Sequence, residues 1–205
     1  MVTLTLLHTA AVHVPVFDAL GEREHSGAVL RHLVRPGLLE RARVVGPEGV
    51  RAEVREVLAE AAGPVLVTCS TIGGVAESLA PELGYPVLRV DRAMAARAVA
   101  TGARIVVLAA LESTLGPSTE LLGEEGAREV RGLVVPGAWG LFEAGDVGGY
   151  LRAVASAADR VKGADVIVLA QASMAGAVHL VRTRIPVLAS PALGLAAALA
   201  GERTG

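Results

Sequence analysis

The fold is decided by residues 65–74, which read VLVTCSTIGG. The first four residues are an apolar run typical of a buried strand, and they lead into a polar turn and then a helix from about Gly73. Cys69, Ser70 and Thr71 are therefore expected at the carboxyl end of a strand, where open α/β sheets bind their ligands. Cys69 is the only cysteine of the chain.

A second stretch repeats this design later in the chain. Residues 166–178 read VIVLAQASMAGAV, which predicts an apolar strand, a turn of Gln171, Ala172 and Ser173, and a helix that opens with small residues. Each of the two stretches is followed by a further strand that begins with Pro-Val-Leu. The cysteine turn and the glutamine turn are therefore predicted to be pseudo-equivalent.

The rest of the sequence alternates strand-like runs with helical periodicity. The strand-like runs are continuous in Val, Ile and Leu, which is typical of parallel sheets covered by helices on both faces. Two similar halves predict an α/β fold with two pseudosymmetric lobes, each with a parallel sheet flanked by helices, and an active site in the cleft between them. Residues 1–91 and 186–205 are expected to form lobe one, and residues 92–185 lobe two.

The periodicity also predicts the individual elements. Strands are expected at residues 2–7, 43–45, 65–68, 87 onwards, 104–110, 130–135 and 165–170, and helices or helical turns at residues 16–39, 49–62, 75–83, 92–101, 146–161 and 191–200. A hydroxyl-rich stretch at residues 111–119 is expected to lead into a helix that ends near Gly126.

Length, charge and cysteine content limit the classes of function. A chain of 205 residues can bury a sizeable core without disulfides or metals, and one cysteine cannot form an internal disulfide. The formal charge of −2 offers no electrostatic reason to bind nucleic acid or an anionic membrane. No apolar run reaches the ~20 residues of a membrane-spanning helix, and no secretory signal pattern is present. A cytoplasmic protein that binds a small molecule is therefore expected.

Four segments together resemble one protein family. They are TCSTIGG (residues 68–74), PVLRVDRAMAARAV (86–99), IVVLAALESTLGPST (105–119) and VIVLAQASMAG (166–176). These segments are similar to the aspartate/glutamate/hydantoin racemase superfamily over nearly the full length of the chain. The resemblance implies an enzyme that needs no cofactor, with one cysteine from each lobe beside the α-carbon of a small carboxylic or amino acid. One thiolate removes the α-proton, and the opposite thiol returns a proton to the other face.

The resemblance places the first of these cysteines at Cys69 and the second at Gln171. A carboxamide cannot serve as acid or base in this step. Gln171 is the only glutamine of a chain without asparagine, which suggests that it is retained, and it is interpreted as a hydrogen-bonding group for a substrate carboxylate. Superfamily members that resemble arylmalonate decarboxylase also use one cysteine, at the other position, to protonate the enediolate left by loss of CO2. A cofactor-independent isomerase or lyase with Cys69 as the proton-transferring group is therefore predicted.

Further substrate-binding residues are predicted at strand ends and in the turns that follow them. Ser113 and Thr114 match the hydroxyl-bearing turn that holds a carboxylate in the family, although such hydroxyls also cap helices. His8 is interpreted almost equally well as a core histidine. The predicted substrate-binding residues are His8, Thr9, Ser70, Thr71, Ser113, Thr114, Ala172 and Ser173. The remaining histidines have no metal-ligand spacing, so no metal site is expected and these are interpreted as structural or solvated: His13, His25, His32 and His179.

Two other functions fit the same residues. One is a binding protein that holds a small carboxylate or amino acid without turnover, and the other is a maleate-isomerase-like enzyme in which Cys69 forms a covalent adduct. The oligomeric state is left open, with a homo-oligomer among the alternatives. Because hydroxyl and amide donors at a helix N-terminus lower a thiol pKa, the pKa of Cys69 is predicted to lie below its ordinary value of ~8.5.

Overall fold

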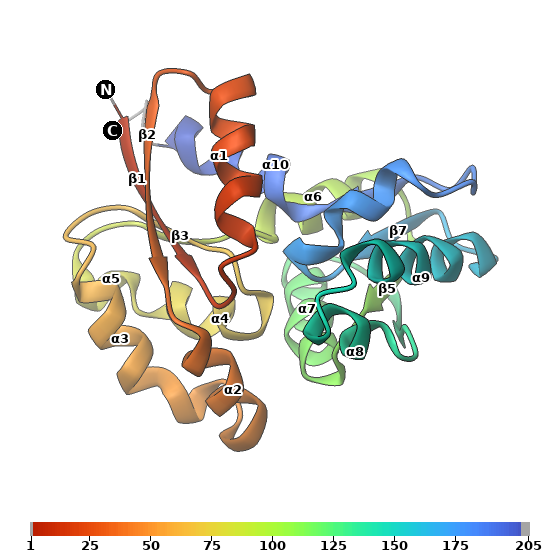
Figure 1. The fold of residues 1–205 in the computed structure, drawn as a ribbon, viewed down its shortest axis with the longest axis horizontal. Coiled ribbons are helices and arrows are strands. Elements are labelled where there is room, and N and C mark those ends of the chain that lie inside the picture. The colour runs from red at the N-terminus through yellow and green to blue at the C-terminus, as the bar shows by residue number, and fades with distance from the viewer. Residues whose placement is uncertain (1, 202–205) are drawn as a thin grey trace. The chain divides into compact units, whose positions relative to one another are not determined.

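The computed structural model describes residues 2–201 of the chain (Figure 1). The chain divides into two compact units, of which the first comprises Met1–Arg92 with Pro191–Gly205 and the second Ala93–Ser190. Each unit is built on one four-stranded sheet in which every pair of neighbouring strands is parallel. The predicted α/β class, with two similar halves and parallel sheets flanked by helices, is therefore confirmed.

The first unit has the strand order β2-β1-β3-β4, and Figure 1 shows its first three strands side by side. Leu4 and Leu6 of β1 face a core covered by α1 and α10, whereas Val65 and Val67 of β3 face a second core under α2, α3 and α4. Both faces are thus buried, as the continuous apolar strand runs predict. The elements are β1 (Val2–His8), α1 (His13–Glu24), β2 (Ala28–Val34), α2 (Pro36–Val45), η1 (Glu48–Val50), α3 (Arg51–Ala59), β3 (Val65–Val67), α4 (Ser70–Ser78), α5 (Ala80–Leu83), β4 (Val87–Arg89) and α10 (Ser190–Gly201).

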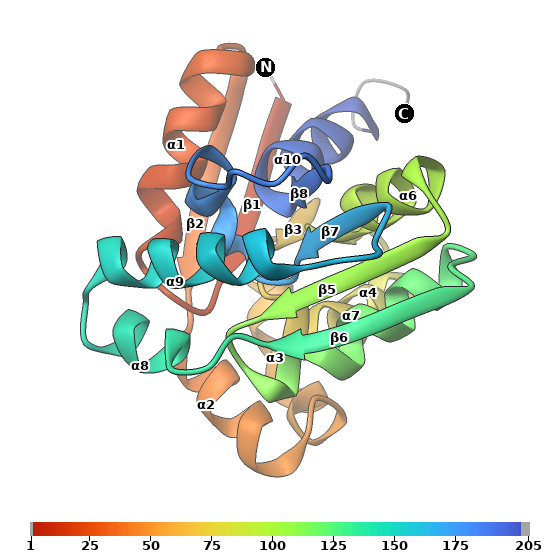
Figure 2. The same cartoon turned by 90° about the vertical axis from the view of Figure 1, so that its right-hand side faces the viewer.

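The second unit has the strand order β6-β5-β7-β8, and Figure 2 shows β5 between β6 and β7. Leu108 and Leu169 face a core covered by α9, which contributes the fully buried Tyr150. Helix α9 begins after Asp146, whose side chain caps the helix by accepting a hydrogen bond from the Gly149 N–H. The elements are α6 (Arg92–Thr101), β5 (Arg104–Ala109), α7 (Glu112–Glu124), β6 (Glu129–Val134), α8 (Ala138–Glu143), α9 (Val147–Arg160), β7 (Val166–Leu169), η2 (Ala172–His179) and β8 (Val187–Ala189).

The two sheets repeat one topology. In each unit the first strand lies between the second and the third, and the fourth strand lies beside the third. In register, Leu7 pairs with Val67 in the first sheet, and Leu108 pairs with Leu169 in the second. The cysteine turn and the glutamine turn follow the third strands of their units at the same distance. Their predicted pseudo-equivalence is therefore confirmed.

Residues 28–45 differ from the prediction. Residues 28–34 form the edge strand β2 instead of helical turns, because a strand with one neighbour is only partly buried and carries polar residues such as Arg31 and His32 among its apolar ones. The strand predicted at residues 43–45 is the end of α2. Val44 and Val45 are 83% and 52% exposed, so this β-branched pair has no sheet to join.

Two helix starts and one strand also differ from the prediction. Helix α4 begins at Ser70 instead of about Gly73, and α7 begins at Glu112 and includes the hydroxyl-rich stretch. Small and hydroxyl residues suit a first helical turn, where N–H groups lack intrahelical partners. The final strand β8, which was expected in lobe one, pairs with β7 in the second sheet. The last helix, α10, does pack on β1 of the first sheet, through Leu195 and Leu199.

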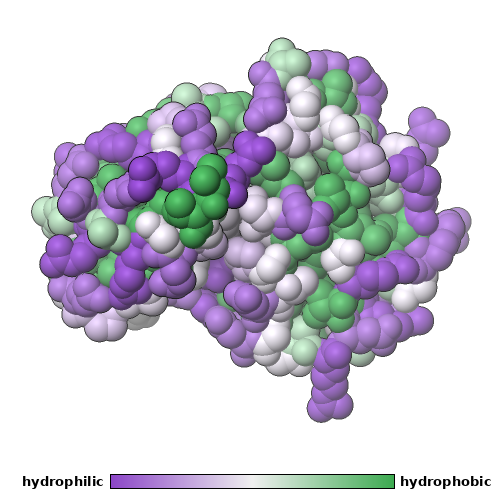
Figure 3. All heavy atoms as spheres, turned by 90° about the horizontal axis from the view of Figure 1, so that it is seen from below, coloured by the Kyte–Doolittle hydropathy of each residue, from purple (hydrophilic) through white to green (hydrophobic). Residues whose placement is uncertain are grey.

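The surface mixes apolar and polar side chains. On the face drawn in Figure 3, hydrophobic residues lie in small groups among hydrophilic ones. Helix α10, SPALGLAAALAG, is rich in apolar residues, but it has only 12 residues. Within residues 2–201, no helix combines the length and the hydropathy needed to cross a membrane.

Candidate functional site

Cys69 occupies the N-cap position of α4. Its backbone is extended, with φ −105° and ψ 112°, so the chain leaves β3 and turns into the helix at this residue. The side chain is partly exposed and borders the core under α4. Although the sulfur makes no cap hydrogen bond of ordinary geometry, the backbone N–H groups of Thr71 and Ile72 and the Thr9 hydroxyl act on it and lower its pKa. The structure therefore brings Thr9 and Thr71, two of the predicted substrate-binding residues, together with Cys69.

The thiol is nevertheless harder to ionise than a free cysteine. Burial raises the pKa of Cys69 and outweighs the three hydrogen-bonding groups, and the charge of Asp91 raises it further. The predicted depression of this pKa is therefore wrong. The sequence shows the donors at the helix start, but it does not show the protein atoms that pack around the sulfur and disfavour the thiolate. At neutral pH the side chain is a thiol and hence a proton donor.

A buried ion pair lies beneath the same helix. Arg89 donates to both carboxylate oxygens of Asp91, from Nε at 2.7 Å and from Nη2 at 3.0 Å, and both side chains are almost fully buried. A side chain at Gly73 would bring its Cβ within 3.1 to 3.2 Å of Arg89, and one at Gly74 would lie 3.3 Å from the guanidinium. The two glycines thus let α4 pack directly on Arg89 of the ion pair, and this close packing explains why small residues stand at these positions.

His8, at the end of β1, is fully buried and belongs to a hydrogen-bonded chain. Its Nδ1 lies 2.8 Å from Thr68 Oγ1, and its Nε2 lies 2.8 Å from His32 Nδ1. The chain continues from His32 Nε2 to Asp18 Oδ1 at 2.9 Å. His8 therefore connects three parallel strands at their carboxyl ends through side chains, and it is more than a passive core histidine.

A second buried histidine lies close to His8. The rings of His8 and His13 have centroids 6.1 Å apart, and His13 is 8% exposed. Burial lowers the pKa of His8 to about 3, with smaller contributions from His13 and His32, and burial lowers the pKa of His13 to about 4. Both rings are therefore neutral at physiological pH. Across residues 2–201, no group of three His, Cys, Asp or Glu side chains is arranged to hold a metal ion.

Gln171 is the N-cap residue of η2, in the second unit. Its backbone angles, φ −115° and ψ 139°, are close to those of Cys69. Its Oε1 accepts a hydrogen bond of 2.6 Å from the N–H of Ala110, at the end of β5. The Nε2 amide, with its two donors, is the part of the side chain that remains for a ligand. Ala172 is buried directly after it and can offer only backbone groups.

The hydroxyl residues predicted in the second unit are in different environments. Ser113 and Thr114 lie in the first turn of α7, and Thr114 is buried. Within the described residues, the buried Oγ of Ser113 has no hydrogen-bond partner. Ser173 Oγ is 2.8 Å from the hydroxyl of Tyr150, whose pKa burial raises to about 12. The Ser113 hydroxyl therefore has unused hydrogen-bonding capacity, whereas Ser173 is held by Tyr150.

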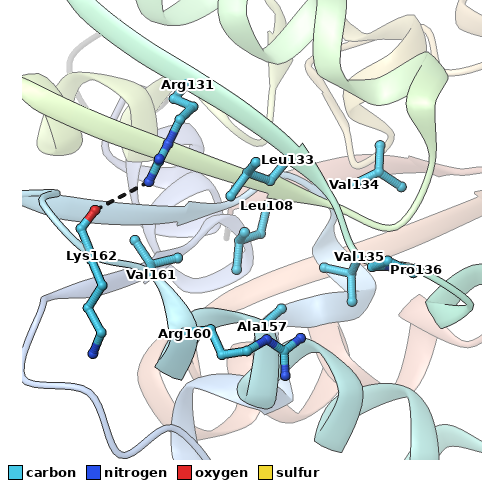
Figure 4. A pocket seen from close by; sticks show the side chains of 10 residues that line it. All are labelled: Leu108, Arg131, Leu133, Val134, Val135, Pro136, Ala157, Arg160, Val161 and Lys162. Atoms are coloured by element: carbon cyan, nitrogen blue, oxygen red, sulfur yellow. Dashed lines mark hydrogen bonds between the residues drawn. The ribbon is translucent and has the colours of Figure 1, made fainter.

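The second unit also has an open pocket of about 310 Å³ between β5, β6 and α9 (Figure 4). Apolar side chains including Leu108 and Leu133 line it together with Arg131, Arg160 and Lys162. Arg131 Nη2 donates to the Lys162 carbonyl at 3.3 Å, as the dashed line in Figure 4 shows. None of the predicted site residues lines this pocket. It is therefore separate from the candidate site.

Several residues of the site were not singled out by sequence analysis. His32 and Asp18 were not predicted as site residues, because β2 was not recognised as a strand. Without that strand, residue 32 is not placed beside residue 8. Thr68 was assigned only to the strand. The available signal was a pair of polar residues at adjacent strand ends, His8 and Thr68, in otherwise apolar runs.

Comparisons with known proteins give no match by sequence and clear matches by structure. No protein-family model matches the chain. No curated protein matches it either. An allantoin racemase from Pseudomonas fluorescens superposes with a TM-score of 0.69 at 19% identity, covering 100% of this chain and 92% of that one. A glutamate racemase isoform from Bacillus anthracis gives 0.70 at 13% identity, with coverages of 100% and 83%.

A third matching structure is a decarboxylase. Arylmalonate decarboxylase superposes with a TM-score of 0.62 at 19% identity, covering 99% of this chain and 93% of that one. These identities are too low to carry residue roles from one chain to another. They do show that this chain has the fold shared by these racemases and the decarboxylase, which is the fold that the four sequence segments predict.

Proposed function

We propose that this protein is a cofactor-independent isomerase or lyase that transfers a proton at the α-carbon of a small carboxylic or amino acid, with Cys69 as the proton-transferring group. The observation that carries the proposal is the position of Cys69 at the N-cap of α4, at the carboxyl end of a parallel strand. Backbone donors of Thr71 and Ile72 act on its sulfur there. Ligands of open α/β sheets bind at this edge.

The protonation state of Cys69 favours one direction of transfer. Because burial raises its pKa, the resting side chain is a thiol that can protonate a carbanion or enediolate. The S–H bond breaks as a C–H bond forms at the α-carbon, and solvent then returns a proton to the thiolate. Thr9 and the α4 N–H groups stabilise that thiolate while it exists, and the same N-terminal donors suit the negative oxygen of an enediolate.

Gln171 limits what this chemistry can achieve. Racemisation needs a second proton-transferring group on the other face of the carbanion, and the carboxamide at the position pseudo-equivalent to Cys69 cannot supply one. Protonation from one side after loss of CO2, or exchange of the α-proton with retention, needs only Cys69. We therefore infer one-sided chemistry, with Gln171 Nε2 and Ser113 Oγ as proposed contacts for the substrate carboxylate. Ser70, Thr114, Ala172 and Ser173 remain proposed contacts of lower chemical specificity.

The proposal is tested by a substrate screen in D2O. Purified protein is incubated with aspartate, glutamate, hydantoins, allantoin and arylmalonates, the compound classes named for the racemases and the decarboxylase with this fold and for the predicted superfamily. Deuterium at the α-carbon and released CO2 are measured, with Cys69→Ala and Cys69→Ser as paired controls. Incorporation that requires Cys69 supports the proposal.

The same experiment separates the two alternatives. Mass spectrometry of the intact protein during turnover detects a covalent adduct on Cys69, which would indicate a maleate-isomerase-like nucleophile instead. Saturable binding without deuterium uptake or CO2 release would indicate a binding protein. Turnover that persists in Cys69→Ala would show that another residue transfers the proton.

A further inference from the structure

A continuous chain of hydrogen-bonded side chains leads from solvent to the end of β3. It begins at Asp18 on α1, whose side chain is 50% exposed, and passes through His32 on β2, whose side chain is 14% exposed. It then reaches His8 and Thr68, which are both buried. The three links measure 2.9, 2.8 and 2.8 Å from the surface inwards. Such an ordered path from an exposed carboxylate into the interior constrains where its hydrogen atoms lie.

The innermost link fixes the direction of the chain. Thr68 Oγ1 lies 3.1 Å from the carbonyl oxygen of Leu7, and only the hydroxyl can supply the hydrogen between these two oxygens. The hydroxyl oxygen must then accept from His8, so the hydrogen of the neutral His8 ring is on Nδ1. The unprotonated Nε2 of His8 can only accept, so His32 donates to it from Nδ1.

The outermost link adds a second hydrogen to His32. Its Nε2 faces Asp18 Oδ1, and an exposed carboxylate is an acceptor at neutral pH. We propose that His32 is an imidazolium paired with Asp18, and that its charge sets the direction of the hydrogen bonds through His8 and Thr68. His8 and Thr68 are thereby positioning residues for the cysteine turn.

The link to Cys69 runs through the chain itself. Thr68 directly precedes Cys69, and His8 directly precedes Thr9, whose hydroxyl acts on the thiol. The bond between His8 and Thr68 therefore ties together the two strand ends that present the donor and the sulfur. This positioning role rests on the proposed function, whereas the protonation pattern of the chain does not.

Discharge of His32 reverses the chain. A neutral His32 that keeps its hydrogen on Nε2, towards Asp18, accepts at Nδ1 from Nε2 of His8. Nδ1 of His8 then accepts from the Thr68 hydroxyl, and the chain holds one proton fewer. The carbonyl oxygen of Leu7 still accepts a hydrogen bond from the Thr68 backbone N–H, at 2.9 Å, but it no longer accepts one from the Thr68 hydroxyl. The orientation of the residue before Cys69 thus depends on a charge at the surface.

The other groups around His8 do not compete for this charge. His13 and Phe17 of α1 face it with ring centroids 6.1 and 5.5 Å away, while His32 stacks on it from β2 at 5.1 Å. Phe17 does not titrate, and burial holds the pKa of His13 at about 4. His32 and Asp18 are therefore the charged members of the cluster at neutral pH.

Nitrogen-15 NMR of the histidine rings tests the protonation pattern in the intact protein. At neutral pH we expect both ring nitrogens of His32 to be protonated, and His8 to carry its single hydrogen on Nδ1. Asp18→Asn should discharge His32 and move the His8 hydrogen to Nε2, whereas Glu22→Gln, an exposed charge change on the same helix, should leave both rings unchanged. A neutral His32, or a hydrogen on Nε2 of His8, in the wild-type protein would overturn the inference.

Alkylation of Cys69 by iodoacetamide as a function of pH tests the positioning role. In the wild type, the rate should show an inflection that coincides with the move of the His8 hydrogen from Nδ1 to Nε2 seen by NMR, in addition to that of the thiol. Its amplitude should be about fivefold, the typical effect of one hydrogen bond. Thr68→Val should remove that inflection, and Thr68→Ser should retain it. A rate that follows only the thiol in all three proteins would refute the positioning role. The role of Cys69 in turnover is measured separately by the D2O screen.

Discussion

The two halves of this protein present different chemistry on the same backbone frame. The strand registers make Thr9 equivalent to Ala110 and Cys69 equivalent to Gln171. In the first unit the Thr9 hydroxyl acts on the Cys69 thiol. In the second unit the backbone N–H at the position equivalent to Thr9 donates to the Gln171 carboxamide. His8 and Thr68 are joined by a side-chain hydrogen bond, and the residues at their equivalent positions in the second unit are Ala109 and Ala170.

The difference extends to the fourth strands. Arg89 and Asp91 form a buried ion pair in the first unit, and the register places Ala189 of the second unit at the position equivalent to Arg89. Polar and ionisable groups are thus gathered at the strand ends of one half and replaced by small apolar residues in the other. The comparison indicates that a duplicated scaffold fixes where a side chain stands, whereas the side chains in contact with it decide what it does. The following predictions test that contrast.

Removal of the thiol should have the largest effect. Cys69→Ala is expected to reduce proton transfer by about 10²- to 10⁴-fold, the usual contribution of a positioned acid. Cys69→Ser should be nearly as impaired, because a hydroxyl is a much weaker acid than a thiol. The measurement is α-deuteration or CO2 release, with unfolding by urea as a check on stability. Retention of most of the activity in both variants would assign the chemistry to the second half or to another residue.

Breaking the buried ion pair should be the next largest effect. Arg89→Met leaves the Asp91 carboxylate buried and unpaired, which should lower the free energy of unfolding by about 3–5 kcal/mol. The double variant with Asp91→Ala should recover much of this loss, because no unpaired charge is then left buried. Arg92→Met, which breaks the more exposed pair with Glu77, should cost about 1 kcal/mol or less. Urea unfolding measures all three, and equal losses in Arg89→Met and Arg92→Met would contradict the assignment.

Acidification should destabilise the first unit through its buried histidines. The folded-state pKa values of His8 and His13 are lowered by burial to about 3 and about 4, from an ordinary value of 6.5. Below pH 6.5 the unfolded chain binds protons that the folded chain does not, so the free energy of unfolding falls as pH falls through this window. Above pH 6.5 these groups contribute no pH dependence.

The expected loss is about 2 kcal/mol per histidine between pH 6.5 and pH 5. His13→Phe should remove its share of the loss, whereas the exposed His179→Phe should not. Urea unfolding at several pH values measures the slope. An unchanged slope in His13→Phe would show that this ring is protonated in the folded protein.

A thiol in the second half should have the smallest effect on stability and a qualitative effect on stereochemistry. The wild type is expected not to interconvert the enantiomers of a substrate, and Gln171→Cys should gain weak racemisation. The variant loses the hydrogen bond from Ala110 to Oε1, at a cost of about 1 kcal/mol. Gln171→Ala loses the same bond without gaining a thiol and serves as the matched control. Rapid racemisation by the wild type would show that a residue other than Cys69 supplies a second acid.

Local pattern was sufficient for much of the fold. Continuous Val, Ile and Leu runs predicted β1, β3, β5 and β7, which are central strands buried on both faces. The edge strand β2 was missed, because its single neighbour leaves it half exposed and its sequence then resembles an amphipathic helix. The pair Val44-Val45 was misassigned for the converse reason, since β-branched residues form a strand only beside a partner.

Some features of the candidate site were likewise predictable from local sequence, and others were not. Local sequence was enough to predict the α/β class, the repeated turn and the place of Cys69 and Gln171 within it, because each depends on short-range periodicity and on residue types a few positions apart. The tertiary structure was needed to show that burial raises the pKa of Cys69 and that His8 is joined to Asp18 through His32. Those properties depend on burial and on partners brought together from β1, β2 and β3, and burial outweighs the nearby N–H groups of Thr71 and Ile72 in setting the pKa of Cys69.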